Sequence, residues 1–214
     1  MVKISPSVLS ADFLDLEKDL KKLKEAGVEM VHLDIMDGIF VPNISFGVPV
    51  IKSIRKHTDL ILDVHLMIDR PHRYIKEFAE VSDYLGFHYE AGSDVLETLK
   101  EIKAVGCKTC LTIKPCTEPQ EIFPFLELCD MVLVMSVEPG FGGQKFMPDA
   151  LRKIKIFKEE IKKRGLNTEI EVDGGINAET AKLAISAGAT VLVAGSFIFS
   201  SENMAESVAA VKGL

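Results

Sequence analysis

The sequence predicts an α/β protein, a (βα)₈ barrel of the TIM type that forms one domain over residues 1–214. Eight short runs of aliphatic residues alternate with amphipathic helical stretches, which is the order of βα units. The runs are almost continuously apolar, as expected of parallel strands covered on both faces. A doubly wound open sheet is the competing architecture, and the number of units favours a closed barrel.

The predicted strands recur about every two to three dozen residues, a spacing that leaves room for one helix between each pair. In chain order they are Ile4–Pro6, Met30–Ile35, Leu60–Leu66, Tyr84–His88, Lys108–Ile113, Met131–Val137, Glu169–Val172 and Val191–Ala194. No composition break or low-complexity segment divides the chain, so we expect a single domain.

Capping residues mark the helices between these strands. Asp12 is predicted to cap the first helix, which Gly27 ends, and Asn177 is predicted to cap a helix that runs through Ala187. The charged runs Glu17–Lys24 and Lys153–Arg164 are interpreted as solvated helix faces.

Composition excludes several classes of partner. The chain has 214 residues, of which 47% are hydrophobic and 27% charged, and its net charge is −7. This charge argues against nucleic acid, because binding a phosphate backbone requires a basic surface. We find no segment typical of a bilayer span and no signal-peptide pattern at the start, and we therefore expect a cytoplasmic protein with no membrane partner.

The four cysteines include one C-x-x-C pair, Cys107 and Cys110. A redox or zinc motif is one interpretation. The pair lies in or beside the predicted strand Lys108–Ile113, where positions i and i+3 point to opposite faces, whereas a redox pair would open a helix. We therefore expect all four cysteines to be reduced thiols.

Ionisable side chains gather where the apolar runs end, at His32-Leu33-Asp34, Asp63-Val64-His65 and Glu171-Val172-Asp173. On a strand, positions i and i+2 share a face, so each cluster presents two polar groups to the same side. Such groups are costly inside a barrel unless they bind a ligand. Two histidines and two aspartates could together hold a divalent first-row metal ion, and residue types alone do not choose among zinc, iron, manganese and cobalt.

Glycine-rich turns follow three successive strands near the C-terminus. They are Gly140-Phe141-Gly142-Gly143, Gly174-Gly175 and Gly195-Ser196. Glycine lets a ligand approach the backbone N–H groups closely, and the turns after the last strands of a barrel commonly bind phosphate. We therefore expect a small phosphorylated substrate.

These motifs together resemble the ribulose-phosphate 3-epimerase family, in the correct order and over essentially the whole chain. The matching stretches are Lys3–Ser7, His32–Gly38 with Phe40–Asn43, Asp63–Met67, Val137–Gln144 and Glu171–Gly175. The H-L-D-I-M-D-G-x-F-V-P-N block is the most specific of them. One departure is Cys116, where the family usually has glycine, and it concerns a loop only.

The resemblance implies a metal-dependent barrel that interconverts D-ribulose 5-phosphate and D-xylulose 5-phosphate by inverting C3 through an enediolate. Asp34 and Asp173 would be the two proton-transferring residues. The metal ligands would be His32, Asp34, His65 and Asp173, with Zn²⁺ preferred over Fe²⁺, Mn²⁺ or Co²⁺. Substrate contacts would come from Ser7, His65, Gly140, Phe141, Gly142, Gly143, Asp173, Gly174, Gly175, Gly195 and Ser196.

Further implications concern the surroundings of the site. Met36, Met67 and Met135 would form an apolar cover over the reacting centre, and the loops Gly38–Phe46 and Gly140–Phe146 are long enough to act as lids. Asp63 and Glu171 would then be supporting groups rather than ligands. Exposed apolar faces on barrel helices often pair, so we expect a homo-oligomer.

Three alternative functions remain. D-Allulose-6-phosphate 3-epimerase shares the metal motif, although its loops tend to depart from G-F-G-G and D-G-G. Related sugar-phosphate decarboxylases use a D-x-K-x-x-D array, and here Met36 stands where the lysine would be. A non-catalytic phosphate-binding barrel would have no need of two histidines and two aspartates on inward strand faces.

Overall fold

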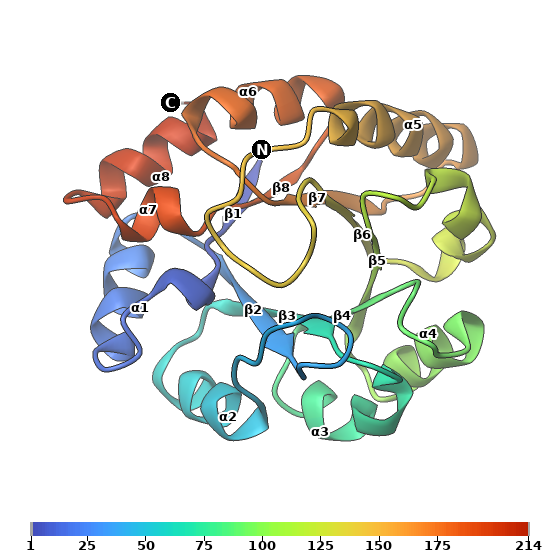
Figure 1. Cartoon of the computed structure of the whole chain (residues 1–214), viewed down its shortest axis with the longest axis horizontal. Coiled ribbons are helices and arrows are strands. Elements are labelled where there is room, and N and C mark those ends of the chain that lie inside the picture. The colour runs from blue at the N-terminus through green and yellow to red at the C-terminus, as the bar shows by residue number, and fades with distance from the viewer. Residues whose placement is uncertain (1, 214) are drawn as a thin grey trace.

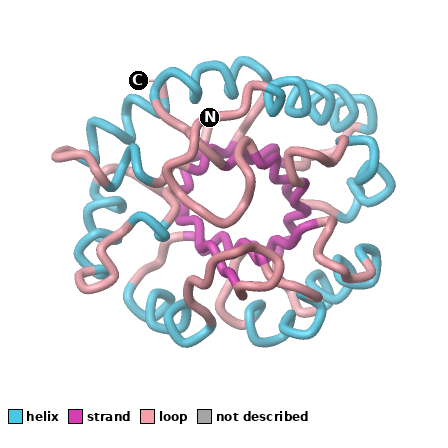
Figure 2. Tube along the Cα trace, viewed as in Figure 1, coloured by secondary structure: helices cyan, strands magenta, loops and turns pink. Residues whose placement is uncertain are grey.

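Eight parallel strands form a barrel surrounded by helices, as Figures 1 and 2 show for the computed structural model, which describes residues 2–213. The strands are β1 (Lys3–Ser5), β2 (Met30–Met36), β3 (Ile61–Met67), β4 (Tyr84–His88), β5 (Lys108–Ile113), β6 (Met131–Met135), β7 (Glu169–Asp173) and β8 (Val191–Val193). Each predicted strand overlaps one of these, so the prediction of a single-domain TIM barrel is confirmed.

Helices cover the outer face of the barrel. They are α1 (Leu16–Glu25), α2 (Val48–His57), α3 (Ile75–Ala79), α4 (Val95–Ala104), α5 (Asp149–Arg164), α6 (Ala178–Ala187), α7 (Ser196–Phe199) and α8 (Met204–Lys212), with the 3₁₀ helices η1 (Val8–Ser10), η2 (Pro71–Tyr74) and η3 (Pro119–Leu128). A 3₁₀ helix follows β5 in place of an α-helix. It contains Pro124, whose ring nitrogen cannot donate an intrahelical hydrogen bond.

Strands β1 and β2 close the barrel. The sheet order runs from β1 through β8, β7, β6, β5, β4 and β3 to β2. The two end strands then meet at a parallel bridge between Ser7 and His32, and the His32 N–H donates to the Pro6 carbonyl at 3.0 Å. Barrel closure therefore brings Ser7 beside the first polar cluster.

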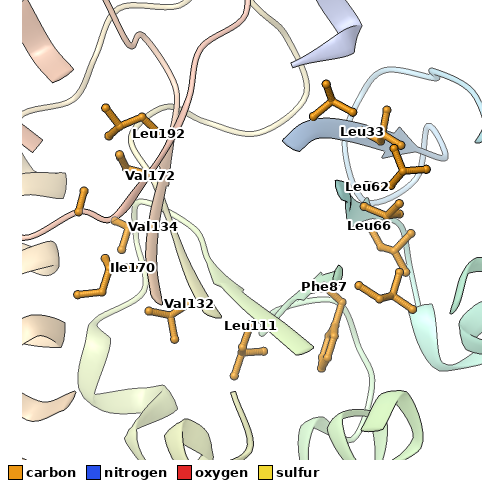
Figure 3. Close-up of a cluster of buried hydrophobic side chains, with 14 of the residues drawn as sticks. Leu33, Leu62, Leu66, Phe87, Leu111, Val132, Val134, Ile170, Val172 and Leu192 are labelled. Carbon is orange, nitrogen blue, oxygen red and sulfur yellow. The ribbon is translucent and has the colours of Figure 1, made fainter. Parts of the chain in front are cut away.

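Alternation along the strands separates two faces. Leu33, Leu62 and Leu66 belong to the outer core between strands and helices, which Figure 3 shows around the barrel wall. A second cluster, which includes Met30, Cys110 and Leu133, is formed by residues of the opposite face. This parity leaves His32, Asp34, Asp63 and His65 on the inward face, as the spacing predicts.

The cysteines follow the same parity. Cys107 belongs to the outer core and Cys110 to the inner cluster, and both are free thiols, as are Cys116 and Cys129. The prediction that the C-x-x-C pair points to opposite faces is confirmed. Among residues 2–213, no helix combines the length and apolar character that crossing a lipid bilayer requires.

The predicted cap of the first helix is wrong, whereas the predicted cap of α6 is correct. Helix α1 begins at Leu16, and Asp12 does not cap it, because the Asp12 carboxylate accepts the N–H of Leu14 within the preceding turn. By contrast, Asn177 caps α6 as predicted, accepting the N–H groups of Glu179 and Thr180.

Lys153 on α5 is buried rather than solvated, with 1% of its surface exposed. Its ammonium group donates to the carbonyl oxygens of Pro115 at 2.5 Å and Thr117 at 2.7 Å, in the turn that follows β5. The ammonium group of Lys153 therefore supplies the hydrogen bonds that these two carbonyl oxygens, which are not paired in the sheet, would otherwise receive from water. This burial corrects the interpretation of Lys153–Arg164 as a wholly solvated face.

We expect Lys153→Met to lower the free energy of unfolding by about 1–3 kcal/mol, because it leaves buried carbonyl oxygens without a donor. Lys155→Met on the exposed side of the same helix is the matched control and should change stability by less than about 0.5 kcal/mol. Urea denaturation followed by circular dichroism measures both. Equal effects of the two substitutions would contradict a structural role for the buried ammonium group.

Candidate active site

Three strands bring four ionisable side chains to one point on the barrel axis. β2 carries His32 and Asp34, β3 carries His65, and β7 carries Asp173. One nitrogen or oxygen atom from each residue lies within 4.8 Å of the corresponding atoms of the other three. The structure therefore brings together the whole predicted ligand set, although these strands are far apart in the sequence.

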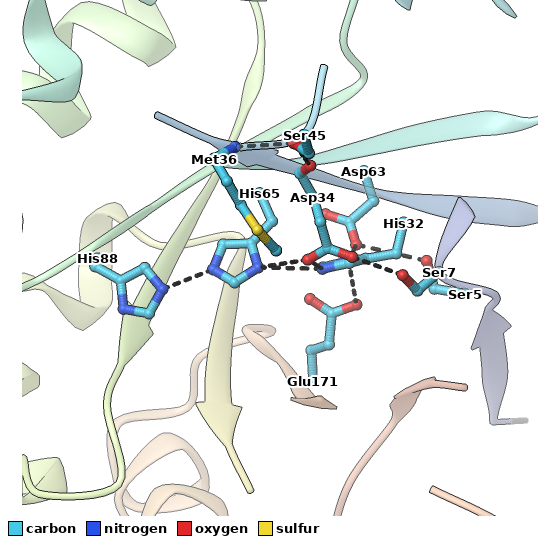
Figure 4. Close-up of polar contacts among 10 residues, drawn as sticks. All are labelled: Ser5, Ser7, His32, Asp34, Met36, Ser45, Asp63, His65, His88 and Glu171. Atoms are coloured by element: carbon cyan, nitrogen blue, oxygen red, sulfur yellow. Dashed lines mark hydrogen bonds and ion pairs between the residues drawn. The ribbon is translucent and has the colours of Figure 1, made fainter. Parts of the chain in front are cut away.

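Adjacent pairing of β2 and β3 sets the closest contacts of this cluster. Asp34 lies opposite His65 in the register, and His32 lies opposite Asp63. His32 Nε2 is 3.2 Å from His65 Nδ1, and the two nitrogens are 3.4 Å and 3.5 Å from Asp34 Oδ1 (Figure 4). Two nitrogen and two oxygen donors facing one point are a set that suits a divalent metal ion, so this cluster could hold one.

Asp63 contacts His32 at Nδ1, the ring nitrogen that does not face Asp34 and His65. Asp63 Oδ2 is 2.6 Å from His32 Nδ1 and 3.5 Å from the Ser5 hydroxyl. When the Asp63 carboxylate oxygen accepts this hydrogen bond, Nδ1 is the donor and Nε2 faces Asp34 and His65. Glu171 is buried beside them, 3.8 Å from the same Nδ1.

Burial and neighbouring charges move the pKa values of this cluster in opposite directions. Burial alone would lower the pKa of His32, but the carboxylates of Asp63 and Asp34 raise it well above its ordinary value. Burial alone would raise the pKa of Asp34, but His32 and His65 lower it below its ordinary range. Burial, reinforced by the charge of Asp34, raises the pKa of Asp173 to about 7.

The two aspartates therefore differ at neutral pH without a metal ion. Asp34 is ionised, because it is paired with imidazoles, while Asp173 carries a proton part of the time. Burial, followed by the charge of Asp63, also raises the pKa of Glu171 well above its ordinary value, which favours its neutral form. The cluster thus limits the negative charge that it buries.

A cavity of about 640 Å³ opens above the aspartates at the C-terminal end of the strands. Of the predicted substrate-binding residues, its lining includes Ser7, Gly140, Phe141, Gly142, Gly143, Asp173, Gly174, Gly175, Gly195 and Ser196. His65 is not in this lining and is buried, with 1% of its surface exposed. The glycine turns and the two aspartates thus line one cavity.

Apolar groups and two loops close this cavity. Met36, Met67 and Met135 line it, as the sequence predicts. The Asn43 side-chain amide donates to the Gly140 carbonyl at 2.7 Å, which ties the loop after β2 to the loop after β6. Figure 1 shows the second loop crossing the mouth of the barrel.

The loop after β6 packs directly against Gly175, which leaves no room for a side chain at that position. The φ of Gly175 is +63°, and a Cβ atom there would lie 2.8 Å from the Cα of Phe146. A side chain would therefore displace the loop that covers the cavity.

The sequence alone does not predict several contacts at the site. Ser7 Oγ donates to Asp34 Oδ2 at 2.6 Å, and Ser45 Oγ donates to the Asp34 carbonyl oxygen at 2.5 Å. Ser10 and Asn177 also line the cavity. Ser10 ends the short 3₁₀ helix η1, Ser45 lies in the loop after β2, and Asn177 was predicted only as a helix cap, so only the folded chain shows their proximity to the site.

Comparison with known proteins finds relatives that share one enzyme name. The chain is 46% identical to the ribulose-phosphate 3-epimerase of Methanocaldococcus jannaschii over 208 residues, covering 97% of this chain and 88% of the relative. It is 44% identical to that of Bacillus subtilis over 215 residues, covering 100% and 99%. The cytoplasmic isoform of Oryza sativa is 42% identical, covering 98% and 92%.

Solved structures at lower identity share the fold. Orotidine 5′-phosphate decarboxylase from Pyrococcus horikoshii aligns with a TM-score of 0.68 at 17% identity, covering 99% of this chain and 100% of that chain. The 3-hexulose-6-phosphate synthase of Salmonella typhimurium aligns with a TM-score of 0.68 at 18% identity, covering 99% and 97%.

The model of the ribulose-phosphate 3 epimerase family matches residues 3–199, which span every strand that contributes to the cluster and the cavity. With this match and relatives above 40% identity along nearly the whole chain, the protein belongs to the ribulose-phosphate 3-epimerase family.

Proposed function

We propose that this protein inverts C3 of a ketose phosphate and interconverts D-ribulose 5-phosphate and D-xylulose 5-phosphate. The observation that carries the proposal is the pair Asp34 and Asp173, which lie on separate strands and both line the cavity. The names of the relatives support the same substrate.

Inversion at C3 requires one group to remove a proton and another to deliver a proton to the opposite face. A single base would tend to return the proton to the face from which it came. Asp34 is ionised and suits the base, while Asp173, whose pKa is raised to about 7, suits the acid. In the reverse direction their roles exchange.

We propose His32, Asp34, His65 and Asp173 as the ligands of one divalent ion, with Zn²⁺ preferred and Fe²⁺, Mn²⁺ or Co²⁺ as alternatives. When bound, such an ion supplies Lewis-acid stabilisation of negative charge on the substrate oxygens. Asp34 has an oxygen for each task, because Oδ1 faces the imidazoles and Oδ2 is held by Ser7.

The glycine turns are proposed to bind the phosphate. Gly142, Gly143, Gly175, Gly195 and Ser196 line one cavity and offer backbone N–H groups with little side-chain bulk. Met36, Met67 and Met135 are proposed to exclude water from the enediolate without donating protons to it.

We also propose a cytoplasmic location for this protein. The name of the rice relative supports a cytoplasmic location. Association with further copies of this chain stays a prediction. D-Allulose-6-phosphate 3-epimerase activity remains the alternative within the same chemistry, and a non-catalytic phosphate-binding barrel is the alternative outside it.

A substrate comparison in heavy water tests the function. We expect turnover of D-ribulose 5-phosphate to exceed that of D-allulose 6-phosphate, and the product to carry deuterium at C3, because the proton removed there exchanges with solvent. Mass spectrometry and NMR measure the label, and metal content is determined on the same sample. Faster turnover of the hexulose phosphate would favour the alternative enzyme, and phosphate binding without turnover would favour the binding protein.

Asp34→Asn and Asp173→Asn should each lower kcat by at least about 1000-fold, because each removes one proton-transferring carboxylate. The fold should persist, which circular dichroism and thermal unfolding can check. Asp59→Asn is the control, since Asp59 is exposed and pairs with Lys24 on the barrel exterior. Near-normal turnover in either site variant would rule out the two-aspartate mechanism.

Metal uptake by the metal-free protein should release more protons at pH 6 than at pH 8. His32, whose pKa is raised well above its ordinary value, must also give up any second ring proton to the incoming ion. Asp173, with a pKa raised to about 7, is mostly protonated at pH 6 and mostly ionised at pH 8, so its proton is released only at the lower pH.

Calorimetric titration with Zn²⁺ in buffers of different ionisation enthalpy counts these protons. In Asp173→Asn the difference between the two pH values should disappear. Equal release by the wild-type protein at pH 6 and pH 8 would contradict the assignment of the raised pKa to Asp173.

A further inference from the structure

Two further side chains, His88 and Glu90, extend from His65 away from the metal cluster. His88 ends β4 and is fully buried, and its Nε2 lies 2.8 Å from His65 Nε2 (Figure 4). On its other side, His88 Nδ1 lies 3.4 Å from Glu90 Oε2. His65, His88 and Glu90 therefore form a continuous polar row, which we call the His65 relay.

Glu90 is anchored at the outer end of this relay. Its Oε1 accepts the backbone N–H of Lys114 at 2.9 Å and the hydroxyl of Thr117. These two donors leave Oε2 directed at His88. Burial would raise the pKa of Glu90, but the adjacent His88 and the hydrogen bonds from Thr117 and the Lys114 N–H lower it to about 2, so the carboxylate is ionised.

An ionised carboxylate facing His88 Nδ1 sets the direction of the hydrogen bond between His88 and His65. The contact between Glu90 Oε2 and His88 Nδ1, at 3.4 Å, is an ion-pair contact without hydrogen-bond geometry. Because a negative oxygen favours a hydrogen on the nitrogen that faces it, His88 Nδ1 carries the hydrogen, and neutral His88 then has a lone pair on Nε2. That lone pair requires His65 Nε2 to be the donor. His65 Nδ1 is consequently left with its lone pair, and it is the atom that faces Asp34 and His32.

We propose that Glu90 is a positioning residue, which acts through His88 to hold His65 in the tautomer that offers Nδ1 to the metal ion. The inference rests on the proposed metal site. Outer-shell partners of this kind commonly change metal affinity by about 10- to 100-fold. Here the partner is two side chains removed from the ligand.

The other ligand histidine is held by a different arrangement. Asp63 contacts His32 Nδ1 directly, which leaves Nε2 for the metal ion, whereas the relay leaves Nδ1 of His65. The two imidazoles therefore need opposite tautomers. The carboxylate that contacts His32 is Asp63 on the adjacent strand β3. The carboxylate that acts on His65 is Glu90, in the turn after β4, and it acts through His88.

Packing alone is the competing explanation for His88. Its ring lies 4.8 Å from the ring of Phe40 and 4.9 Å from that of His65, so it also fills space beside the loop after β2. If His88 only fills space, the direction of its hydrogen bonds has no effect on metal affinity. Glu90→Gln separates the two explanations, because it keeps the size of the side chain.

In Glu90→Gln, the amide oxygen is expected to keep the donors of Lys114 and Thr117, so the NH₂ group faces His88 Nδ1. His88 then has to move its hydrogen to Nε2, and His65 has to move its hydrogen to Nδ1, where it blocks the ligand atom. We expect the dissociation constant for Zn²⁺, measured on the metal-free protein against a competing chelator, to rise about 10- to 100-fold. The visible absorption of bound Co²⁺ should shift or weaken in parallel.

Substitutions at His88 make the test specific for the relay. In His88→Gln, the amide oxygen can accept from His65 Nε2 whatever residue stands at position 90. His88→Gln alone should therefore stay within about 3-fold of wild type, and adding Glu90→Gln to it should have no further effect. His88→Leu, which fills space but accepts no hydrogen bond, should bind Zn²⁺ at least about 10-fold more weakly than His88→Gln.

Glu202→Gln, an exposed carboxylate in the turn between α7 and α8, is the control for lost charge and should leave metal affinity unchanged. Thermal unfolding shows that each variant is folded, and the His88 pair tests the relay independently of Glu90. Unchanged affinity in Glu90→Gln, or equal affinities of His88→Gln and His88→Leu, would overturn the inference. A wild-type protein that binds neither Zn²⁺ nor Co²⁺ would instead overturn the proposed metal site, and the relay with it.

Discussion

The register between β2 and β3 is the constraint on which the site depends. It places His32 opposite Asp63 and Asp34 opposite His65, so each histidine faces a carboxylate across the same strand pair. A slip of one residue would turn these polar groups into the outer core and bring Leu33 and Val64 to the barrel axis. Packing of the leucines against the helices therefore also positions the proposed ligands, since the same register serves both faces.

This arrangement makes the inner cluster expensive to fold without a metal ion. His32, Asp34, Asp63 and Glu171 are all buried. The cost is limited because His32 is paired with two carboxylates, while burial favours the neutral forms of Asp173 and Glu171. A cation at this point would compensate the remaining negative charge, which supports a metal site here more strongly than any single pair of residues does.

Much of this architecture follows from periodicities that a sequence displays directly. Alternation along strands predicts that His32 and Asp34 share a face, and the position of the glycine turns after the last strands predicts that they border one cavity. Other features depend on distances between remote segments. Lys153 has the sequence environment of a solvated lysine, yet it is buried because the turn at Pro115–Thr117 folds back over α5. The loop contact between Asn43 and Gly140 likewise has no local signature.

Hydrogen-bond direction is the property that links the outer residues to the site, and residue spacing does not predict it. His65 and His88 are both histidines at strand ends, and their ring nitrogens are equivalent until a group of known charge fixes one hydrogen. Glu90 is that group, and it is held in turn by Lys114 and Thr117, in the turn whose carbonyl oxygens Lys153 binds. Contacts run from the outer helix α5 through this turn to Glu90, His88 and His65, so a helix on the outside of the barrel contributes to the order of the proposed ligand nitrogen.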